Sequence, residues 1–494
     1  MDRIKRTITG VSSKTWLWLI IGLGLAARLL AVLIMGDQVE VLPGIYDQVS
    51  YHTLATRVLD GHGFSFASEW WPVTQAGEPT AHWSYLYTFY LTAVYALVGV
   101  HPLVARLVQA IAVGVAMPWL AYRLADSLLP KTRGEGSRVR GFSTQLRAFP
   151  YPLSHTPYPL LPLLAAAWVA FYPYFIYYSA ALMTEMLYIT AIMWSLDSAI
   201  QLAYSRKYFV RRRGWGSFAL LGLALGAAVL LRQVYLAFVP FLLAWLGLTL
   251  RFSRYIPRVG GEAVTPAPSP LDPLPQGERG RYVWVSAAVL VICVLPFTAW
   301  NYHQFGRFVL LNTNAGYAFF WANHPIHGND FVPLFTPDMP TYQQLIPAEL
   351  RGLDEAALEQ ALMARGVDFV FADLWRYVRL SLSRIDDHFY FLPSADSSLL
   401  SNVTRVSSLM VALPFMLLGM LAWILKTNRQ LTGGLLRRLG GLLAEPGGLL
   451  LLFIAVYAGV HLLSWAGIRY RLPTDAVMLL FAAYSIQSFP LRNE

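Results

Sequence analysis

Two carboxylates in this sequence are placed where acid–base chemistry could occur. Asp47 follows the segment LPGIY and opens a stretch whose apolar residues recur at helical spacing, and Glu185 lies in YYSAALMTEMLYI between two long apolar runs. Two carboxylates held together can act as general acid and base on a substrate hydroxyl. Each residue also has a structural interpretation, Asp47 as the N-cap of a helix and Glu185 as an acid in a first helical turn.

Three arginines could hold an anionic substrate. Arg232 ends an apolar run in LLRQV, and Arg469 and Arg471 form the motif RYR shortly before Pro473. The planar guanidinium group offers parallel donors to a phosphate, so these positions indicate a phosphate site. The alternative is that each side chain extends along apolar surface to reach lipid headgroups. Arg28 lies inside the first apolar run, where we expect it to reach headgroups or to pair with an acid.

The composition indicates that these residues belong to a membrane protein. The chain has 494 residues, of which 56% are hydrophobic and 13% charged, against about 25% charged in soluble domains, and its mean hydropathy is +0.47. About ten apolar runs are long enough to cross a bilayer, which predicts an all-α polytopic protein. The single cysteine, Cys293, excludes an internal disulfide bond. The net charge of +10 comes from basic clusters between the runs and does not indicate nucleic-acid binding.

These basic clusters fall in alternate loops, and the alternation predicts the topology. Because cytoplasmic loops are enriched in Lys and Arg, both termini are predicted to be cytoplasmic, with residues 36–102 and 301–403 external. We divide the chain into a transmembrane module, 1–300, that includes the loop 36–102, an external region, 301–403, and C-terminal transmembrane helices, 404–494. The arrangement predicts a multi-pass protein of the plasma membrane whose candidate site faces outside.

Amphipathic helices are predicted in both external regions. From Asp47, apolar residues at helical spacing predict a helix on the membrane surface that ends at Gly61 and Gly63, and residues 85–98 form a second apolar helix at the same interface. A further amphipathic helix follows Asp354. Past a break at Gly366, we expect one apolar stripe on the outer membrane face or against the loop around Asp47. The residues of this stripe are Val367, Val370, Phe371, Leu374, Trp375 and Val378.

The ten histidines do not indicate a metal site by their spacing. Only His324 and His327 are close in sequence, and no cysteine or carboxylate accompanies them at a spacing typical of zinc ligands. The sequence also contains neither a P-loop nor a GxGxxG unit. We therefore expect no cofactor, with a divalent cation as the minor alternative.

Motifs in a fixed order give most of the chain a resemblance to a known family. They are IYDQVSYHTLATRVLDGHGFS, GEPTAHWSYLYTFYLTAVYALVGVHPLVARLVQAI, YPYFIYYSAALMTEMLYI, GLALGAAVLLRQVYLAFVP, NYHQFGRFVLLNTNAGYAFFWANHP and IRYRLPTDAVMLLFAAY. In this order they resemble the GT-C superfamily of glycosyltransferases that use polyprenyl-phosphate sugars. The chain is most similar to bacterial relatives of the protein O-mannosyltransferases and of the lipid A aminoarabinose transferase. The resemblance implies a GT-C-like bundle of about ten transmembrane helices.

The resemblance also implies roles for individual residues. Asp47 matches the family's essential acid of the first external loop, Glu185 the acid after the third span, and Arg232 the basic residue near the lipid phosphate. Arg469 and Arg471 match the basic pair before the last conserved span. The candidates for donor or acceptor contacts in the first external loop are Tyr46, Tyr51, His82 and Tyr85.

Two positions depart from the family pattern. Trp83 and Ser84 replace a Pro-Pro that often precedes the second interfacial helix, so the geometry of the acceptor loop does not follow from the resemblance. Asp475 occupies a position that is usually Pro or neutral, so it either adds a third external acid or has no role in the site.

The function that the resemblance implies is inverting sugar transfer. Asp47 would take the proton from an acceptor hydroxyl as it attacks C1 of a sugar joined to polyprenyl phosphate. The phosphate can leave without protonation when arginines neutralise its charge. The expected partners are a polyprenyl-phosphate sugar, a protein, lipid or glycan acceptor, and the membrane, with no nucleic acid.

Three alternatives stay open at this point. A transporter or flippase of lipid-linked sugars would have a similar number of spans, but it would place acids or broken helices at the membrane midplane. A membrane scaffold with an external binding domain would not require Asp47 and Glu185 to be close. An oligosaccharide ligase or oligosaccharyltransferase would use a lipid diphosphate donor and often a metal.

Overall fold

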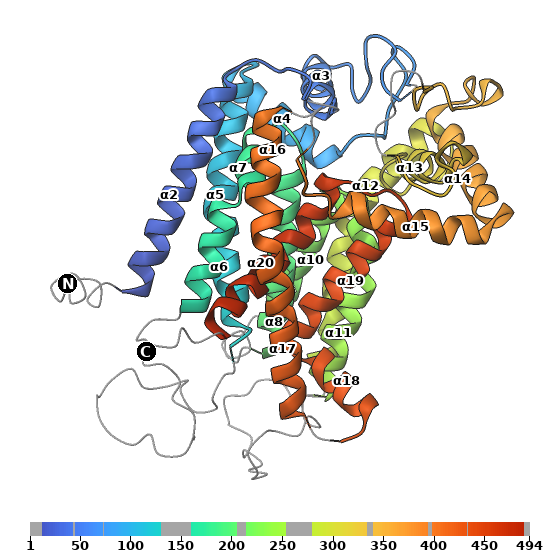
Figure 1. Cartoon of the computed structure of the whole chain (residues 1–494). Helices are drawn as coiled ribbons and strands as arrows, with labels where there is room; N and C mark the ends of the chain where they lie inside the picture. Colours follow the sequence, from blue (N-terminus) through green and yellow to red (C-terminus); the bar gives the residue numbers. More distant parts are fainter. Residues whose placement is uncertain are drawn as a thin grey trace, which may run out of the picture.

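The structure is a bundle of long helices with shorter helices at one end (Figure 1). This computed structural model describes residues 12–42, 45–72, 74–129, 160–204, 214–252, 279–332, 339–393, 398–431 and 433–488. Within these ranges the secondary structure consists of helices and isolated β-bridges, without strands. The predicted all-α class is therefore confirmed.

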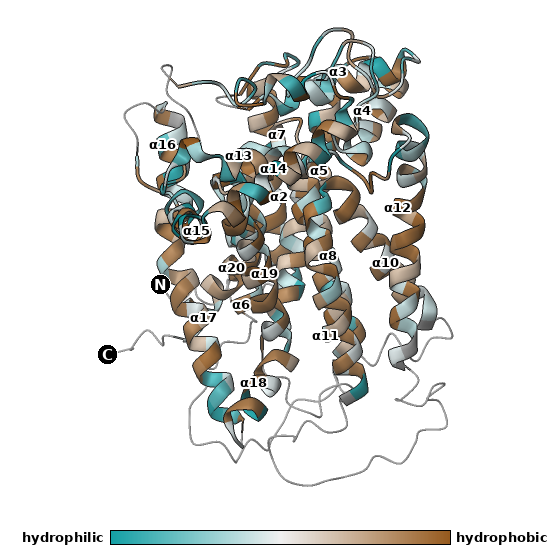
Figure 2. Cartoon of the chain, turned by 90° about the vertical axis from the view of Figure 1, so that its right-hand side faces the viewer, coloured by the Kyte–Doolittle hydropathy of each residue, from teal (hydrophilic) through white to brown (hydrophobic). Residues whose placement is uncertain are grey.

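The long helices follow the predicted apolar runs. They are α2 (Ser13–Met35), α5 (Pro102–Asp126), α6 (Leu160–Phe171), α7 (Pro173–Ala180), α8 (Glu185–Tyr204), α10 (Gly214–Leu231), α11 (Val239–Phe252), α12 (Val283–Phe305), α17 (Val411–Gln430), α19 (Pro446–Leu463) and α20 (Ile468–Ser488). Their apolar residues lie along the middle of the bundle, whereas hydrophilic residues gather at its ends (Figure 2). This distribution is the one expected of a protein that spans a bilayer.

The number of spans differs from the prediction of about ten. In the described part of the chain, seven helices are long and apolar enough to cross a membrane, and the bent pair α6 and α7 is an eighth. The difference arises at α10, whose apolar part is short, and at α20, which begins with Arg469, Arg471 and Asp475. Both helices are still part of the bundle, since α10 lies against α8 and α12, and α20 lies against α6 and α17.

One span is broken by a proline and capped by a buried arginine. The axis bends by 49° between α6 and α7, where Pro173 cannot continue the hydrogen bonding of α6. Arg28 donates to the exposed carbonyls of Ala170 at 2.6 Å and Val169 at 3.1 Å. The prediction that Arg28 reaches headgroups or pairs with an acid was wrong, because the partial negative charge at this helix end serves as its partner.

Both regions predicted to be external lie at the same end of the bundle (Figure 1). The first contains α3 (Asp47–Leu59) and α4 (Tyr85–Val98), which confirms the two helices predicted there. The second contains α13 (Ala315–Asn323), α14 (Glu355–Ala372), α15 (Leu374–His388) and α16 (Leu399–Arg405). The helix α18 (Leu435–Ala444) lies at the opposite end.

The predicted break at Gly366 was wrong. Helix α14 continues through Gly366 and ends at Ala372, and the Asp373 side chain then caps α15 by accepting from the Arg376 amide. At Gly366 a side chain would lie 2.9 Å from the Phe319 ring, so this glycine allows α13 and α14 to pack closely. The apolar residues of α15, Leu374 and Trp375 among them, remain exposed, which fits a helix lying on the membrane surface.

The last helix, α20, is fixed in the bundle by a close backbone contact. A Cβ at Gly419 of α17 would lie 1.7 Å from the carbonyl oxygen of Phe481, so no larger residue fits there. Small residues of this kind let membrane helices approach closely. The first turn of α20 carries Arg469 and Arg471, whose positions are therefore defined by the packing of the bundle.

Cysteine labelling can test which side of the membrane each end faces. In a Cys293→Ser background, cysteines at Ser68 and Asp330 are expected to react with an impermeant reagent added from outside, because both positions are exposed at the end that carries α3 and α13. Cysteines at Ser137 and Ser269 are expected to be protected; both residues lie outside the described ranges. External labelling at Ser137 would contradict the predicted orientation.

Candidate active site

The predicted base, Asp47, is the first residue of α3 and points toward α20. Its Oδ2 accepts a hydrogen bond from Nη1 of Arg469 at 2.6 Å, between residues 422 positions apart in sequence. The N-cap of α3 is Tyr46, which makes no side-chain capping bond. The capping interpretation of Asp47 is therefore wrong, and its carboxylate takes part in a tertiary ion pair.

Glu185 and Arg232 complete a cluster of alternating charges. Nη1 of Arg469 also lies 3.9 Å from Oε1 of Glu185, the first residue of α8. The same Glu185 oxygen forms an ion pair with Nη2 of Arg232, whose Nε donates to Thr184 Oγ1 at 2.8 Å. We call Asp47, Arg469, Glu185 and Arg232 the four-charge cluster. It joins the start of α3 to α8, to the end of α10 and to α20.

The members of the cluster differ in how far they reach solvent. The side chain of Glu185 is 2% exposed, whereas those of Asp47, Arg469 and Arg232 are 19%, 23% and 16% exposed. Asp47 and both arginines are therefore partly accessible in this structure, whereas Glu185 is enclosed by its partners. The geometry makes Glu185 the partner that holds the two arginines and leaves Asp47 as the accessible carboxylate.

Tyr470 supports both arginines and was not predicted as a site residue. The guanidinium of Arg469 lies 4.9 Å and that of Arg232 5.7 Å from the centre of the Tyr470 ring. The Tyr470 hydroxyl also accepts from Nη2 of Arg469 at 2.9 Å. Such cation–π contacts help to keep two like charges side by side. The sequence signal that could have identified Tyr470 as a site residue was its position between the two arginines of the motif RYR.

Arg471 is not brought together with the other two arginines. It is fully buried, with its Nε donating to both oxygens of Asp475 at 3.0 and 3.1 Å, and the Tyr172 hydroxyl donates to the same carboxylate at 2.8 Å. Nη1 of Arg471 donates to the His388 carbonyl at 2.8 Å. Residues two apart point to different sides of a helix, so Arg469 and Arg471 cannot face one site. Asp475 is a buried partner of Arg471 and not an additional external acid.

Two of the four predicted loop residues lie beside the cluster. Tyr51 is buried, its hydroxyl accepts from the Ser84 amide at 3.3 Å, and burial together with the nearby Asp47 carboxylate raises its pKa. His82 is buried as well; burial lowers its pKa to about 4, and the Asp47 carboxylate partly opposes this effect. Tyr46 precedes Asp47 and is mostly exposed. These positions fit contacts with a substrate bound at Asp47.

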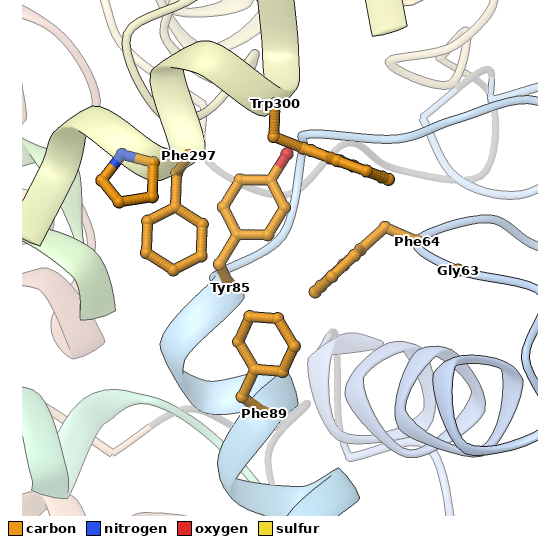
Figure 3. A pocket seen from close by; sticks show the side chains of 7 residues that line it. Gly63, Phe64, Tyr85, Phe89, Phe297 and Trp300 are labelled. Atoms are coloured by element: carbon orange, nitrogen blue, oxygen red, sulfur yellow. The ribbon is translucent and has the colours of Figure 1, made fainter. Parts of the chain in front are cut away.

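Tyr85, the fourth loop residue, lines a separate apolar pocket (Figure 3). The pocket has a volume of about 280 Å³, and no member of the four-charge cluster lines it. The Tyr85 hydroxyl donates to Oδ1 of Asn301 on α12, so the polar end of the side chain is already paired. The lining residues are Gly63, Phe64, Tyr85, Phe89, Pro296, Phe297 and Trp300.

The geometry bears on two of the alternative functions. Asp47 and Glu185 both contact Arg469, so the two predicted acids are close in space, which a scaffold does not require. The cluster lies at the end of the bundle that carries α3, whereas a transporter is expected to place such charges at the midplane.

Within the described ranges, no three His, Cys, Asp or Glu side chains could share a metal ion. The expectation of a metal-free reaction stays a prediction.

Comparison with known proteins identifies the fold. No family model and no curated protein matches the sequence. The structure is similar to archaeal oligosaccharyltransferase AglB from Archaeoglobus fulgidus in complex with an inhibitory peptide and a dolichol-phosphate, with a TM-score of 0.52, 13% identity, and coverage of 96% of this chain and 50% of that one. The same enzyme tethered to an acceptor peptide containing the NVT sequon gives a TM-score of 0.53 at 12% identity, with the same coverage.

The chain has the GT-C fold. AglB is a GT-C superfamily glycosyltransferase, and the match to it extends over nearly the whole of this chain, which spans about half the length of AglB. ArnT from Cupriavidus metallidurans bound to undecaprenyl phosphate is also similar, at 14% identity, with 96% of this chain and 78% of that one covered, but its TM-score is only 0.39. The predicted class, a polytopic membrane protein with the GT-C fold, is confirmed.

Proposed function

We propose that this protein is an inverting glycosyltransferase that moves a sugar from a polyprenyl-phosphate donor to an acceptor hydroxyl on the extracytoplasmic side of the membrane. The observation that carries the proposal is the four-charge cluster, in which one accessible carboxylate lies beside two accessible arginines. The GT-C fold supports the reaction class. AglB was solved with a dolichol-phosphate, a lipid of the kind proposed here.

In this reaction Asp47 acts as the general base. Its carboxylate is accessible and is held at the start of α3, so it can accept the proton of an acceptor hydroxyl as the oxygen attacks C1 of the sugar. The bond from C1 to the phosphate oxygen breaks on the opposite face of the sugar, and polyprenyl phosphate leaves with both bonding electrons. Attack from the opposite face inverts the configuration at C1.

Arg232 and Arg469 stabilise the departing phosphate. The donor carries one negative charge on its phosphodiester, and the leaving group gains a second as the bond breaks. Hydrogen bonds from the guanidinium groups to the leaving phosphate oxygen become stronger as this oxygen gains charge. Interactions that are stronger in the transition state than in the bound donor lower the barrier, whereas interactions of equal strength in both only bind the donor. Two arginines, each already paired with a carboxylate, favour a monophosphate over the diphosphate donor of an oligosaccharide ligase.

A donor panel tests the proposal directly. Purified protein in nanodiscs should release sugar-free polyprenyl phosphate from at least one polyprenyl-phosphate hexose when a mixture of envelope acceptors is added. Nucleotide sugars and lipid-diphosphate sugars serve as controls and should not be consumed. Turnover of the lipid-diphosphate donors alone would contradict the monophosphate proposal and favour the ligase.

Glu185 is expected to contribute less to turnover than Asp47. Glu185→Gln keeps the size of the side chain but removes the charge that neutralises Arg232, so the binding of dianionic polyprenyl phosphate should become tighter. Transfer should fall by roughly tenfold, since the side chain positions the arginines and does not itself reach the substrate. Equilibrium binding of polyprenyl phosphate and single-turnover rates measure the two effects. Weaker lipid binding by the folded variant would contradict this role.

A further inference from the structure

His82 and Trp83 carry two buried ring nitrogens that have no hydrogen-bond partner. These atoms are Nδ1 of His82 and Nε1 of Trp83, in side chains of residues that are 7% and 5% exposed. Leaving a buried polar atom unpaired costs free energy, and buried polar atoms in folded proteins normally have partners. Two such atoms on consecutive residues indicate a place where a bound molecule supplies the missing hydrogen bonds.

Aromatic rings surround these two residues. The His82 ring packs edge to face against Trp71 and Tyr317, with ring centres 5.5 Å apart in both cases, and against Trp83 at 5.3 Å. Trp83 packs edge to face against Tyr51 at 5.4 Å. Apolar rings with a few placed polar atoms are typical of small-molecule sites. A sugar ring suits this environment, because its C–H faces lie against aromatic rings while its hydroxyls pair with ring nitrogens.

Hydrogen bonds link this segment to the residue after Arg232. The Gln233 side chain donates to Oδ1 of Asn314 at 2.8 Å, and Asn314 Nδ2 donates to the His82 carbonyl at 3.3 Å. Asn312 Nδ2 donates to the Trp83 carbonyl at 2.9 Å. The segment is therefore held at a fixed position relative to the arginine that we assign to the lipid phosphate.

The buried carboxylate of Glu355 fixes the same segment from the side of α14. It accepts hydrogen bonds from the Ala81 amide at 2.8 Å and from the hydroxyls of Thr313 and Thr74. Three hydrogen bonds, from Asn314, from Asn312 and to Glu355, thus hold residues 81–83 in place. The Asp47 carboxylate is close enough to influence the His82 ring. A molecule bound at His82 and Trp83 would therefore lie near Asp47.

We propose that His82 and Trp83 form the subsite for a pyranose ring at the reacting end of the substrates. The proposal rests on the proposed function and extends it by naming the residues that recognise sugar hydroxyls. The ring is either the sugar carried by the lipid donor or a pyranose acceptor, since both meet at Asp47. Trp83 Nε1 donates to a hydroxyl oxygen, and His82 Nδ1 pairs with a second hydroxyl.

Binding measurements on purified protein in nanodiscs separate the two sources. The probes are sugar-free polyprenyl phosphate, polyprenyl phosphate carrying glucose, mannose or N-acetylglucosamine, and the methyl glycosides of these sugars added with sugar-free lipid. The variants are Trp83→Phe and His82→Phe, which keep an aromatic ring and remove the nitrogens. Trp375→Phe, on the exposed face of α15, is the matched control. Thermal melting verifies that each variant is folded.

For a subsite of the donor sugar, Trp83→Phe should weaken the best sugar-loaded lipid by about tenfold while sugar-free lipid binds as in wild type. For an acceptor subsite, only methyl glycoside binding should weaken. Equal changes for all probes, or none, in the folded Trp83→Phe and His82→Phe proteins would overturn the proposal. If wild-type protein binds no polyprenyl phosphate and transfers no sugar, the proposed function itself fails, so the two failures are distinguishable.

Discussion

Asp47→Asn protein is expected to fold and to bind the donor lipid, but to transfer sugar at least ~10²-fold more slowly than wild type. The amide has the size of the carboxylate but cannot accept the acceptor's proton. It also carries no charge to compensate Arg469, to which Asp47 is hydrogen-bonded at 2.6 Å. Because that arginine is then free for the phosphate, donor binding should be preserved or strengthened. Loss of transfer without loss of binding is the signature of a general base.

The measurement for Asp47 is single-turnover transfer at saturating donor, together with equilibrium binding of sugar-free polyprenyl phosphate. Asp60→Asn is the matched control, because Asp60 directly follows α3, is exposed and makes no contact with the four-charge cluster. This control should transfer at the wild-type rate. If purified Asp47→Asn protein transferred within twofold of wild type, Asp47 would not be the base.

Arg232→Ala is expected to lose roughly 2–4 kcal/mol of transition-state stabilisation, the range for removing one preorganised donor to a developing oxyanion. This corresponds to about 30- to 1000-fold in the rate. The change leaves the buried Glu185 with Arg469 at 3.9 Å as its remaining ion-pair partner, so lipid phosphate binding should weaken too. Arg232→Lys keeps the charge but loses the paired donors, and it should fall between alanine and wild type.

An exposed arginine at the same end of the bundle provides the control for Arg232. Arg379 of α15 stacks on Trp375 and belongs to no ion pair of the four-charge cluster, so Arg379→Ala should bind polyprenyl phosphate and transfer sugar as wild type does. Titration of sugar-free polyprenyl phosphate and the rate at saturating donor together report the effect. Wild-type lipid binding by Arg232→Ala would mean that this arginine does not hold the phosphate.

Helix positions near the site could be predicted from local sequence, because periodicity and glycine are local signals. The apolar spacing after Asp47 and the glycines after position 60 predicted α3, and α4 was predicted with its observed bounds. Gly366 misled the prediction, since a glycine in a helix can also mark close packing, here of α13 against α14. A glycine that ends a helix can be told from one that allows close packing only when the neighbouring helix is known.

The composition of the cluster was predicted better than its pairing. Asp47, Glu185, Arg232 and Arg469 were all candidate residues, but nothing local shows that Arg469 binds an acid 422 positions away. The three arginines were treated alike because all are predicted at the external end. The direction in which each side chain points on its helix separates Arg471, which is buried against Asp475, from Arg469. Thr184 and Tyr470 were missed because their roles depend on these pairings.

The four-charge cluster contains as many carboxylates as guanidinium groups, and this balance determines its behaviour in salt solutions. Because the cluster has no formal net charge, its long-range electrostatic field is small and it attracts distant anions only weakly. Added salt screens long-range attraction, so it should change donor binding little. The donor must then be recognised by short contacts once it has diffused along the membrane. After transfer, polyprenyl phosphate bears two negative charges, and once Asp47 has released the proton that it accepted, the cluster again holds two carboxylates and has no net charge. Repulsion from these carboxylates favours departure of the spent lipid.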